Sequence, residues 1–135
     1  DLLKKLRDEL NMAILYISHD MGVIAENCDT VAVMYGGAIM EIADVYALFA
    51  SPLHPYTKGL LACIPDIKKE VDVLPGIQGS VPHLTEIPKG CPFCTRCELA
   101  TDLCRETFPP MRGAAGHRVR CHHIEPDAAG GEAQG

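Results

Sequence analysis

The sequence lacks long apolar segments and has no excess of basic side chains. No uninterrupted apolar run approaches the roughly 20 residues of a membrane-spanning helix. The chain does not open with the basic, apolar and small-residue order of a secretory leader, so nothing in it indicates secretion. A Gly-x-x-x-x-Gly-Lys-Ser/Thr phosphate loop is also missing from the sequence. The formal net charge of −6 argues against nucleic-acid binding by the chain as a whole.

Cysteine, by contrast, is concentrated in one region. Five of the seven cysteines lie within the 31 residues from Cys91 to Cys121. A packed core does not need this density of thiols, so we expect disulfides, zinc or an iron–sulfur cluster to hold them. A chain without a leader is expected in a reducing compartment, where clustered cysteines more often bind metal. From spacing alone, zinc and a four-thiolate [4Fe–4S] cluster fit equally well. The candidate ligands are Cys91, Cys94, Cys97, Cys104, Cys121, His122 and His123.

The first part of the chain has the pattern of an α/β protein with a parallel sheet. Apolar residues recur at helical spacing over residues 2–10, which predicts an amphipathic helix. Residues 13–17 form a continuous apolar run, typical of a strand buried on both faces. A helix, a short turn and a doubly buried strand together indicate half of a βαβ unit.

The elements expected next are marked by capping and turn residues. Asp20 and Asp44 are predicted to cap helices, and Pro55 suits the first turn of another. Gly36-Gly37 predicts the tight turn of a β-hairpin. The expected elements are a helix over 21–27, strands over 29–35 and 38–43, and helices over 45–50 and 55–64.

The character of the sequence changes near residue 65. Eight of the ten prolines lie between residues 65 and 126, and the apolar periodicity fades there. We therefore expect an α/β part over residues 1–64 and a small loop-rich module over 65–123, which needs a cross-link to hold together. Residues 124–135, rich in Ala, Gly and Glu, are predicted to be a disordered tail.

His19 is the candidate for chemistry in the α/β part. It lies just past the C-terminal end of the predicted strand over 13–17, and ligands of open α/β sheets bind at the carboxyl ends of strands. A histidine in that place, next to Asp20, can hydrogen-bond a phosphate or a catalytic water. The alternative is a helix-capping turn without chemistry. Ser18, His19 and Asp20 do not form a catalytic triad, because adjacent residues cannot orient one another in those roles.

Three consecutive segments resemble ATPase subunits of ABC transporters. Residues 13–25 resemble the strand and helix around the switch histidine of these subunits, and residues 29–37 resemble the strand and turn that follow. Residues 51–61 are similar to the His-Pro-Tyr signature of the oligopeptide/dipeptide (and nickel) importer branch. The resemblance runs in order over about residues 1–123. It implies the C-terminal part of a P-loop ABC-type nucleotide-binding domain, followed by a small loop-rich Cys-rich extension.

The resemblance also implies a function. In that family, the histidine at the position of His19 contacts the γ-phosphate of ATP, which is bound with Mg²⁺, and helps to hold the attacking water. The phosphate loop, the Walker B pair and the Leu-Ser-Gly-Gly-Gln signature would lie upstream of Asp1. We therefore expect a fragment, which opens mid-pattern without Met and by itself neither binds ATP well nor hydrolyses it.

The partners follow from the same resemblance. They would be a second ATPase subunit, transmembrane permease subunits and, indirectly, an extracytoplasmic substrate-binding protein, with no nucleic acid. The complete subunit would act at the cytoplasmic face of the membrane in the import of peptides.

The cysteine segment resembles the C-terminal motif of these importers. Four cysteines recur in that motif and are associated there with a [4Fe–4S] cluster. They match Cys91, Cys97, Cys104 and Cys121 here, which leaves Cys94 as a spare thiol. A structural cross-link explains such a cluster better than catalysis, because nothing in the sequence indicates an open coordination position. The rival hypothesis is a non-enzymatic, zinc-binding interaction module.

The segment His54-Pro55-Tyr56 has an adequate structural explanation. Pro55 would start a helix, and the ring of Tyr56 would pack while its hydroxyl finds a partner. We expect this segment to fasten the Cys-rich extension to the α/β part.

Overall fold

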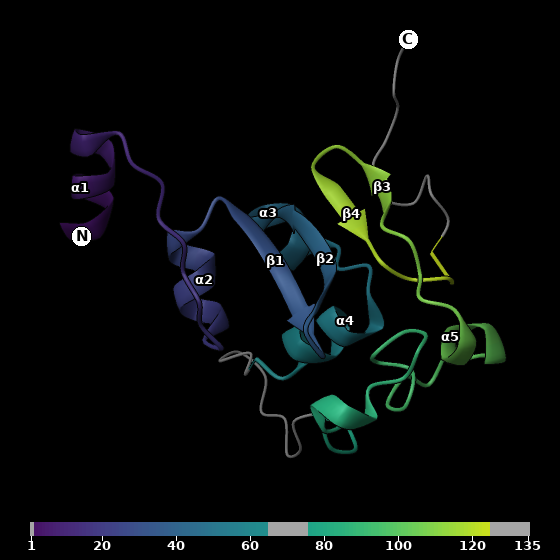
Figure 1. The fold of residues 1–135 in the computed structure, drawn as a ribbon. Coiled ribbons are helices and arrows are strands. Elements are labelled where there is room, and N and C mark those ends of the chain that lie inside the picture. Colours follow the sequence, from purple (N-terminus) through teal and green to yellow (C-terminus); the bar gives the residue numbers. More distant parts are fainter. Residues whose placement is uncertain (1, 65–75, 125–135) are drawn as a thin grey trace, which may run out of the picture.

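A computed structural model of the chain describes residues 2–64 and 76–124. It contains a four-stranded sheet in the order β1-β2-β4-β3, with helices beside it and the cysteine-rich loops at one end (Figure 1). The strands are β1 (Thr30–Tyr35), β2 (Ala38–Asp44), β3 (Arg112–Ala114) and β4 (His117–Val119). The helices are α1 (Leu2–Leu10), α2 (Met21–Asn27), α3 (Val45–Ala50), α4 (Pro55–Ala62) and α5 (Asp102–Glu106), with a 3₁₀ turn over Leu84–Glu86.

The sheet is antiparallel, so the prediction of a parallel sheet is wrong. Every neighbouring pair of strands runs antiparallel. The hairpin of β1 and β2 turns through Gly36 and Gly37, whose φ angles are 57° and 79°. Positive φ at both central residues is the geometry of the two-residue turn that matches the twist of paired strands, and glycine adopts it without strain.

The predicted buried strand over residues 13–17 does not form. This segment has no strand partner in the part of the chain that the structure describes, and the side chains of Leu15 and Ile17 are 86% and 91% exposed. A strand buried on both faces needs neighbouring strands to pair with, and no strand within residues 2–64 and 76–124 pairs with this segment. The apolar pattern of residues 13–17 therefore indicated a preference for burial that the described residues do not satisfy.

The predicted helices do form, and their caps agree with the sequence. The Asp20 carboxylate accepts hydrogen bonds from the amides of Gly22 and Val23, at 2.8 and 3.1 Å. Asp44 caps α3 in the same way, because its carboxylate accepts hydrogen bonds from the amides of Tyr46 and Ala47, at 2.9 and 3.3 Å. Each cap satisfies donors that the first turn of a helix leaves without an intrahelical partner.

Helix α1 stands apart from the rest of the fold (Figure 1). Its leucines, which form the expected apolar face, remain exposed, and the helix has no buried residue. A hollow of about 360 Å³ separates it from the start of β1. The amphipathic pattern predicted the helix correctly, although the surface against which its apolar face would pack is not formed by the described residues.

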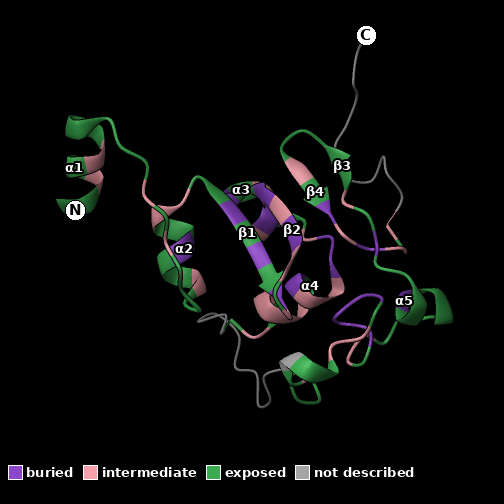
Figure 2. Ribbon diagram, viewed as in Figure 1, coloured by how far each residue is buried: buried purple, intermediate pink, exposed green. Residues whose placement is uncertain are grey.

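Two apolar clusters lie on β1 and β2 (Figure 2). The first cluster is formed with α2 and α3, and Ile24 and Leu48 are among its buried members. The second joins Tyr35 and Met40 of the hairpin to buried residues of the cysteine-rich loops, including Phe93. The loops therefore pack directly on the hairpin and do not form a separate core.

The sheet also joins both sides of the predicted boundary. Strand β4 pairs with β2, with Glu41 opposite Val119. The boundary itself, near residue 65, and the predicted tail after Ile124 lie outside the described residues. In the described part of the chain, no helix combines the length and the apolar character that crossing a bilayer requires.

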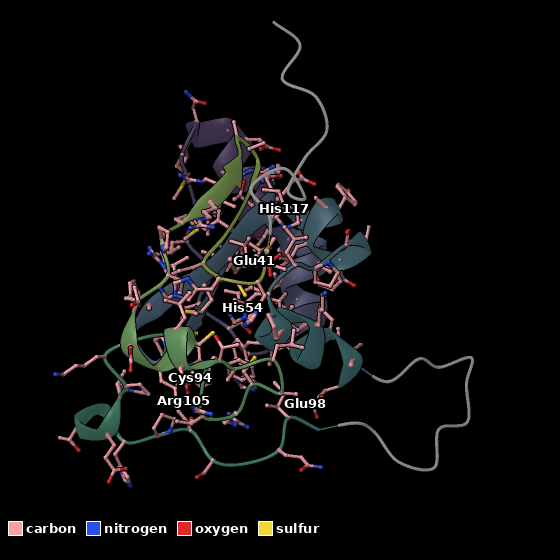
Figure 3. All side chains as sticks on the ribbon, turned by 90° about the vertical axis from the view of Figure 1, so that its right-hand side faces the viewer. Glu41, His54, Cys94, Glu98, Arg105 and His117 are labelled. Carbon is pink, nitrogen blue, oxygen red and sulfur yellow. The ribbon has the colours of Figure 1, made fainter. Side chains whose placement is uncertain are left out.

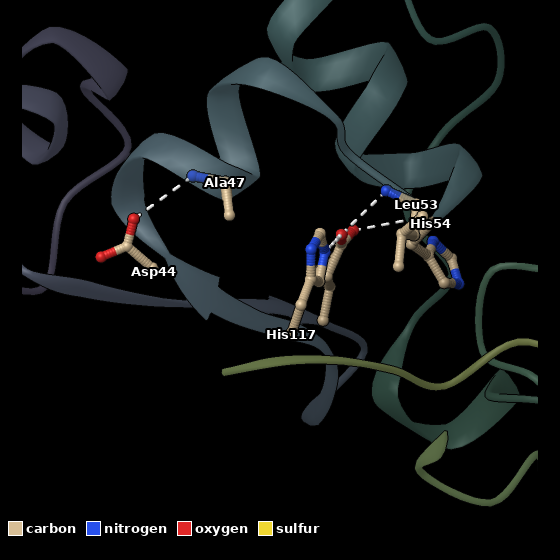
Figure 4. A network of polar contacts seen from close by, with 6 residues as sticks. Asp44, Ala47, Leu53, His54 and His117 are labelled. Carbon is tan, nitrogen blue, oxygen red and sulfur yellow. Dashed lines mark hydrogen bonds and ion pairs between the residues drawn. The ribbon is translucent and has the colours of Figure 1, made fainter. Parts of the chain in front are cut away.

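A buried carboxylate links these parts. Glu41, on β2, is fully buried, and its two oxygens accept hydrogen bonds from the amides of Leu53 and His54, at 2.8 and 2.9 Å (Figures 3 and 4). The His117 Nε2 atom lies 2.7 Å from the Glu41 Oε1 atom and donates to it. One side chain thus connects β2, the start of α4 and β4.

Replacing Glu41 by Gln should destabilise the fold by about 3 kcal/mol. The amide group of Gln would direct a donor at one of the three groups that now donate to the carboxylate, which leaves a buried donor unsatisfied. Urea unfolding would measure the change, with Glu98→Gln as the control because Glu98 is exposed. Equal stability of the two variants would show that the Glu41 network contributes little.

Candidate functional site

The five clustered cysteines converge on one hollow between three segments of the chain. Cys91, Cys94 and Cys97 belong to the loop before α5, Cys104 lies on α5, and Cys121 lies just after Arg120, the residue that follows β4. His54, His122 and His123 line the same hollow. We call this place the cysteine hollow. The structure therefore brings together all four cysteines predicted as ligands, and also places Cys94 there.

Backbone contacts hold the loop against α5. The Gly90 amide donates to the Arg105 carbonyl, at 3.2 Å, and the Cys91 amide donates to the Cys104 carbonyl, at 2.7 Å. A Cβ atom on Gly90 would lie 2.2 Å from the Cys104 carbonyl oxygen, closer than atoms can approach. Glycine is therefore required at position 90 for Cys91 to approach Cys104.

Burial makes four thiols of the cysteine hollow hard to ionise. Burial, together with the neighbouring thiols, raises the pKa of Cys91 to about 11. The pKa values of Cys94, Cys97 and Cys121 are raised mainly by burial as well, with Arg105 acting in the opposite direction at Cys94. A negative charge on one of these buried thiols disfavours ionisation of its neighbours. A cation bound among them would therefore stabilise them as thiolates.

The cysteine side chains are the ligand type that a thiolate-bound metal or cluster requires. Their positions in this structure, however, do not surround a site for such a group. Over residues 2–64 and 76–124, no three His, Cys, Asp or Glu side chains are grouped so that they could hold a metal ion. The hollow has a volume of about 10 Å³, close to the space of one water molecule. Binding a cluster would therefore require the loops that carry the cysteines to move apart.

Aromatic rings join the His-Pro-Tyr segment to the cysteine loops. The Phe93 ring lies 5.2 Å from that of Tyr35 and 5.3 Å from that of Tyr56, measured between centroids. Arg96 extends over the Tyr35 ring and donates to the carbonyls of Ile77 and Gln78. The prediction that residues 54–56 fasten the extension to the α/β part agrees with these contacts.

His54 caps α4, a role that the sequence analysis missed. Its Nδ1 atom accepts a hydrogen bond from the Tyr56 amide at 3.0 Å, and the side chain is only 1% exposed. Burial lowers the pKa of His54 to about 4, although the nearby Glu41 carboxylate acts in the opposite direction. The ring is therefore neutral at pH 7. Histidine is not a common N-cap residue, so the sequence carried little signal for this role.

His19 lies shortly after residues 13–17, which form no helix or strand, and its side chain is exposed to solvent. The Ser18 hydroxyl accepts a hydrogen bond from the Asp20 amide at 3.0 Å, and Asp20 caps α2. The capping turn considered for these residues is thus present. It leaves the His19 side chain outside the cysteine hollow, so the two predicted sites are separate in this chain.

Comparison with known protein families identifies the class of protein to which the middle of the chain is similar. Residues 40–104 match the family described as "Oligopeptide/dipeptide transporter, C-terminal region". This range runs from β2 to α5 and includes the His-Pro-Tyr segment and four of the five clustered cysteines.

The relatives extend the match over most of the chain. The chain is 45% identical over 130 residues to the oligopeptide transport ATP-binding protein AppD of Bacillus subtilis, covering 96% of this chain and 40% of that protein. It is 44% identical over 121 residues to a protein of Brucella melitensis whose name describes peptide import ATP-binding, covering 90% of this chain and 36% of that protein. The chain therefore belongs to the oligopeptide/dipeptide transporter family and corresponds to the C-terminal region of its ATP-binding proteins.

The buried neutral ring of His54 predicts a loss of stability in acid. The unfolded chain takes up a proton near pH 6.5 and the folded chain only near pH 4, so the free energy of unfolding falls as the pH drops between these values. The full effect is roughly 3 kcal/mol. Urea unfolding at several pH values should show a shallower slope for His54→Asn than for the parent chain. The slope should be unchanged in a His83→Ala control, because His83 is exposed. Parallel slopes in all three proteins would contradict this account.

Proposed function

We propose that this chain forms the C-terminal part of the ATP-hydrolysing subunit of an ABC importer for peptides. The observation that carries the proposal is the identity of 44–45% over at least 90% of the chain with proteins named for peptide import and oligopeptide transport. The chain spans 36–40% of the length of these relatives, so the complete subunit would contain further residues.

In this proposal, His19 is the residue of the chain that acts on ATP. Phosphoryl transfer depends on placing the attacking water and on stabilising charge at the γ-phosphate, and an imidazole can do both. The exposed position of His19, after a segment that pairs with no strand in the described part of the chain, is consistent with a site completed by residues outside this chain. ATP and Mg²⁺ would be bound mainly by those residues.

The partners would be those of an importer. A second ATP-binding subunit would complete the nucleotide sites, and transmembrane permease subunits would couple hydrolysis to transport. The subunit would lie at the cytoplasmic face of the membrane, and a substrate-binding protein would deliver the peptide on the other side.

We also propose that Cys91, Cys97, Cys104 and Cys121 hold a [4Fe–4S] cluster. Their convergence from three segments on one buried hollow supports this assignment, and the raised pKa values of Cys91, Cys97 and Cys121 suit ligands that ionise only with a metal present. When bound, the cluster would supply a cross-link of four thiolate bonds. The role of these residues is to tie the loop, α5 and the end of β4 together, which a module with so small a core requires.

Replacing His19 by Ala in the complete subunit should lower ATP hydrolysis at least about 100-fold while changing ATP affinity only a few-fold, because the imidazole acts on the transferred group. Steady-state turnover and equilibrium nucleotide binding would measure the two effects. His83→Ala is the matched control, since His83 is also exposed. Unchanged turnover in the His19 variant would exclude this role.

Cys97→Ser should abolish the cluster, whereas Cys94→Ser should leave it intact, because only the first removes a proposed ligand. The measurements are the iron and sulfide content per chain and the absorbance at about 400 nm after anaerobic purification. A colourless protein with one zinc per chain would favour the zinc-binding interaction module. Equal iron loss in both variants would show that the ligand set is assigned incorrectly.

A further inference from the structure

Two cysteines of the hollow stand at the two ends of one tight turn. The Cys94 amide donates a hydrogen bond to the Cys91 carbonyl at 3.1 Å, so these residues are the first and fourth positions of a β-turn. Pro92 occupies the second position, where the fixed φ angle of proline suits such a turn. The Cα atoms at the ends of a β-turn lie within about 7 Å of each other, which is a separation that a disulfide can span.

The side chains at the two ends of this turn lie in the same place. Cys91 and Cys94 both line the cysteine hollow, and they are only 7% and 4% exposed. The hollow has a volume of about 10 Å³, so the side chains around it are closely packed. A metal centre would need more room, whereas a disulfide needs only that two sulfur atoms come into bonding contact.

We propose that Cys91 and Cys94 are a redox-active pair, which forms a reversible disulfide across the turn. This pair goes beyond the proposed importer function and does not require a bound cluster. It also gives a role to Cys94, the thiol outside the proposed ligand set. In reducing surroundings, disulfides are transient and serve catalysis or redox sensing. Because Cys91 belongs to the ligand set, the disulfide and metal binding through that thiol exclude each other.

The oxidant is a hydroperoxide, represented by hydrogen peroxide. One of the two sulfur atoms attacks a peroxide oxygen, the O–O bond breaks, and the thiol proton leaves with the other oxygen as water, which gives a sulfenic acid. The second thiol then attacks the sulfur of that acid. The S–S bond forms as the S–O bond breaks, and the hydroxyl group leaves with the second thiol proton as water. Two thiols are thereby oxidised to one disulfide, and one peroxide is reduced to two water molecules.

Cys104 is a less suitable partner for Cys91, although their backbones are hydrogen-bonded. The Cys104 sulfur lies 3.4 Å from the Thr101 hydroxyl oxygen and 3.4 Å from the His123 Nε2 atom. A bond from Cys104 to Cys91 would compete with these contacts. The bond to Cys94, by contrast, closes a ring over two intervening residues, so little chain entropy is lost when it forms.

The turn also carries the ring that fastens the cysteine loops to the hairpin. Phe93 lies between the two cysteines in sequence, is buried, and packs on the rings of Tyr35 and Tyr56. A disulfide across the turn would hold the backbone on both sides of Phe93 in the conformation that it already has. Oxidation should therefore leave the fold intact and raise its urea midpoint, because the cross-link restricts the unfolded chain.

Trypsin separates this pair from the other cysteines. It cuts after Lys89 and Arg96, which releases residues 90–96 with Cys91 and Cys94 as the only thiols. The parent chain, freed of metal by a chelator, is treated with hydrogen peroxide, alkylated under denaturing conditions and digested. By mass spectrometry, fragment 90–96 should carry no alkyl group and be lighter by two hydrogen atoms than the unalkylated dithiol. Reduction with dithiothreitol before alkylation should restore both alkyl groups.

Other pairings are visible in the same spectra. Fragment 90–96 joined to the fragment of residues 97–105 would overturn the inference, because that fragment contains Cys97 and Cys104. Two alkylated thiols in fragment 90–96 after peroxide has oxidised the remaining cysteines would overturn it as well.

Urea unfolding tests whether the bond fits the native turn. The midpoint of the parent should rise on oxidation, and this rise should be lost in Cys94→Ser. The control Cys28→Ser should keep both the rise and the disulfide, because Cys28 does not line the hollow. An unchanged or lower midpoint in the oxidised parent would contradict a disulfide that forms without displacing the loop.

Iron analysis separates this inference from the proposed cluster. A parent chain that binds no iron but forms the disulfide in fragment 90–96 would refute the cluster and support the redox-active pair. A chain that binds iron, and whose metal-free form does not make this disulfide with peroxide, would refute the pair alone.

Discussion

The fold depends on one carboxylate that is excluded from water. Burying the charge of Glu41 would be costly without partners, and three donors compensate for it: the amides of Leu53 and His54 and the ring of His117. These donors come from the start of α4 and from β4, which are distant in sequence from β2. Because the carboxylate loses its compensation if any donor moves away, it fixes the two parts of the chain relative to each other.

The hydrogen bonds of Glu41 also position residues at the cysteine hollow. Glu41 holds the backbone of His54, and the ring of His54 packs against Phe93 and lines the hollow. At the turn of the hairpin, Gly36 leaves room for Pro92, whose Cβ atom would lie 2.9 Å from a Cβ atom at that position. The cysteine loops are therefore packed on a rigid support, although their own core is small.

Local signals in the sequence predicted local structure well. Asp20 and Asp44 cap helices, Gly36-Gly37 forms the hairpin turn, and Pro55 begins α4, because each of these preferences is satisfied within a few residues. The parallel sheet was predicted wrongly because the apolar run over residues 13–17 indicates burial without specifying what buries it. Glu41 was missed because a charged residue in a hairpin strand is usually exposed, and its buried role depends on three distant donors.

The sequence by itself determined helices α1 to α4 and the hairpin, since these rest on spacing and short-range chemistry, and it indicated the family through its resemblance to known ATPase subunits. Only the tertiary structure decided that the sheet is antiparallel, that β4 adds to β2, and that His54 shares a hollow with the cysteines. The reason is physical: spacing constrains residues that are neighbours along the chain. Contacts between distant segments are selected by packing, and by the need to satisfy buried polar groups such as the Glu41 carboxylate.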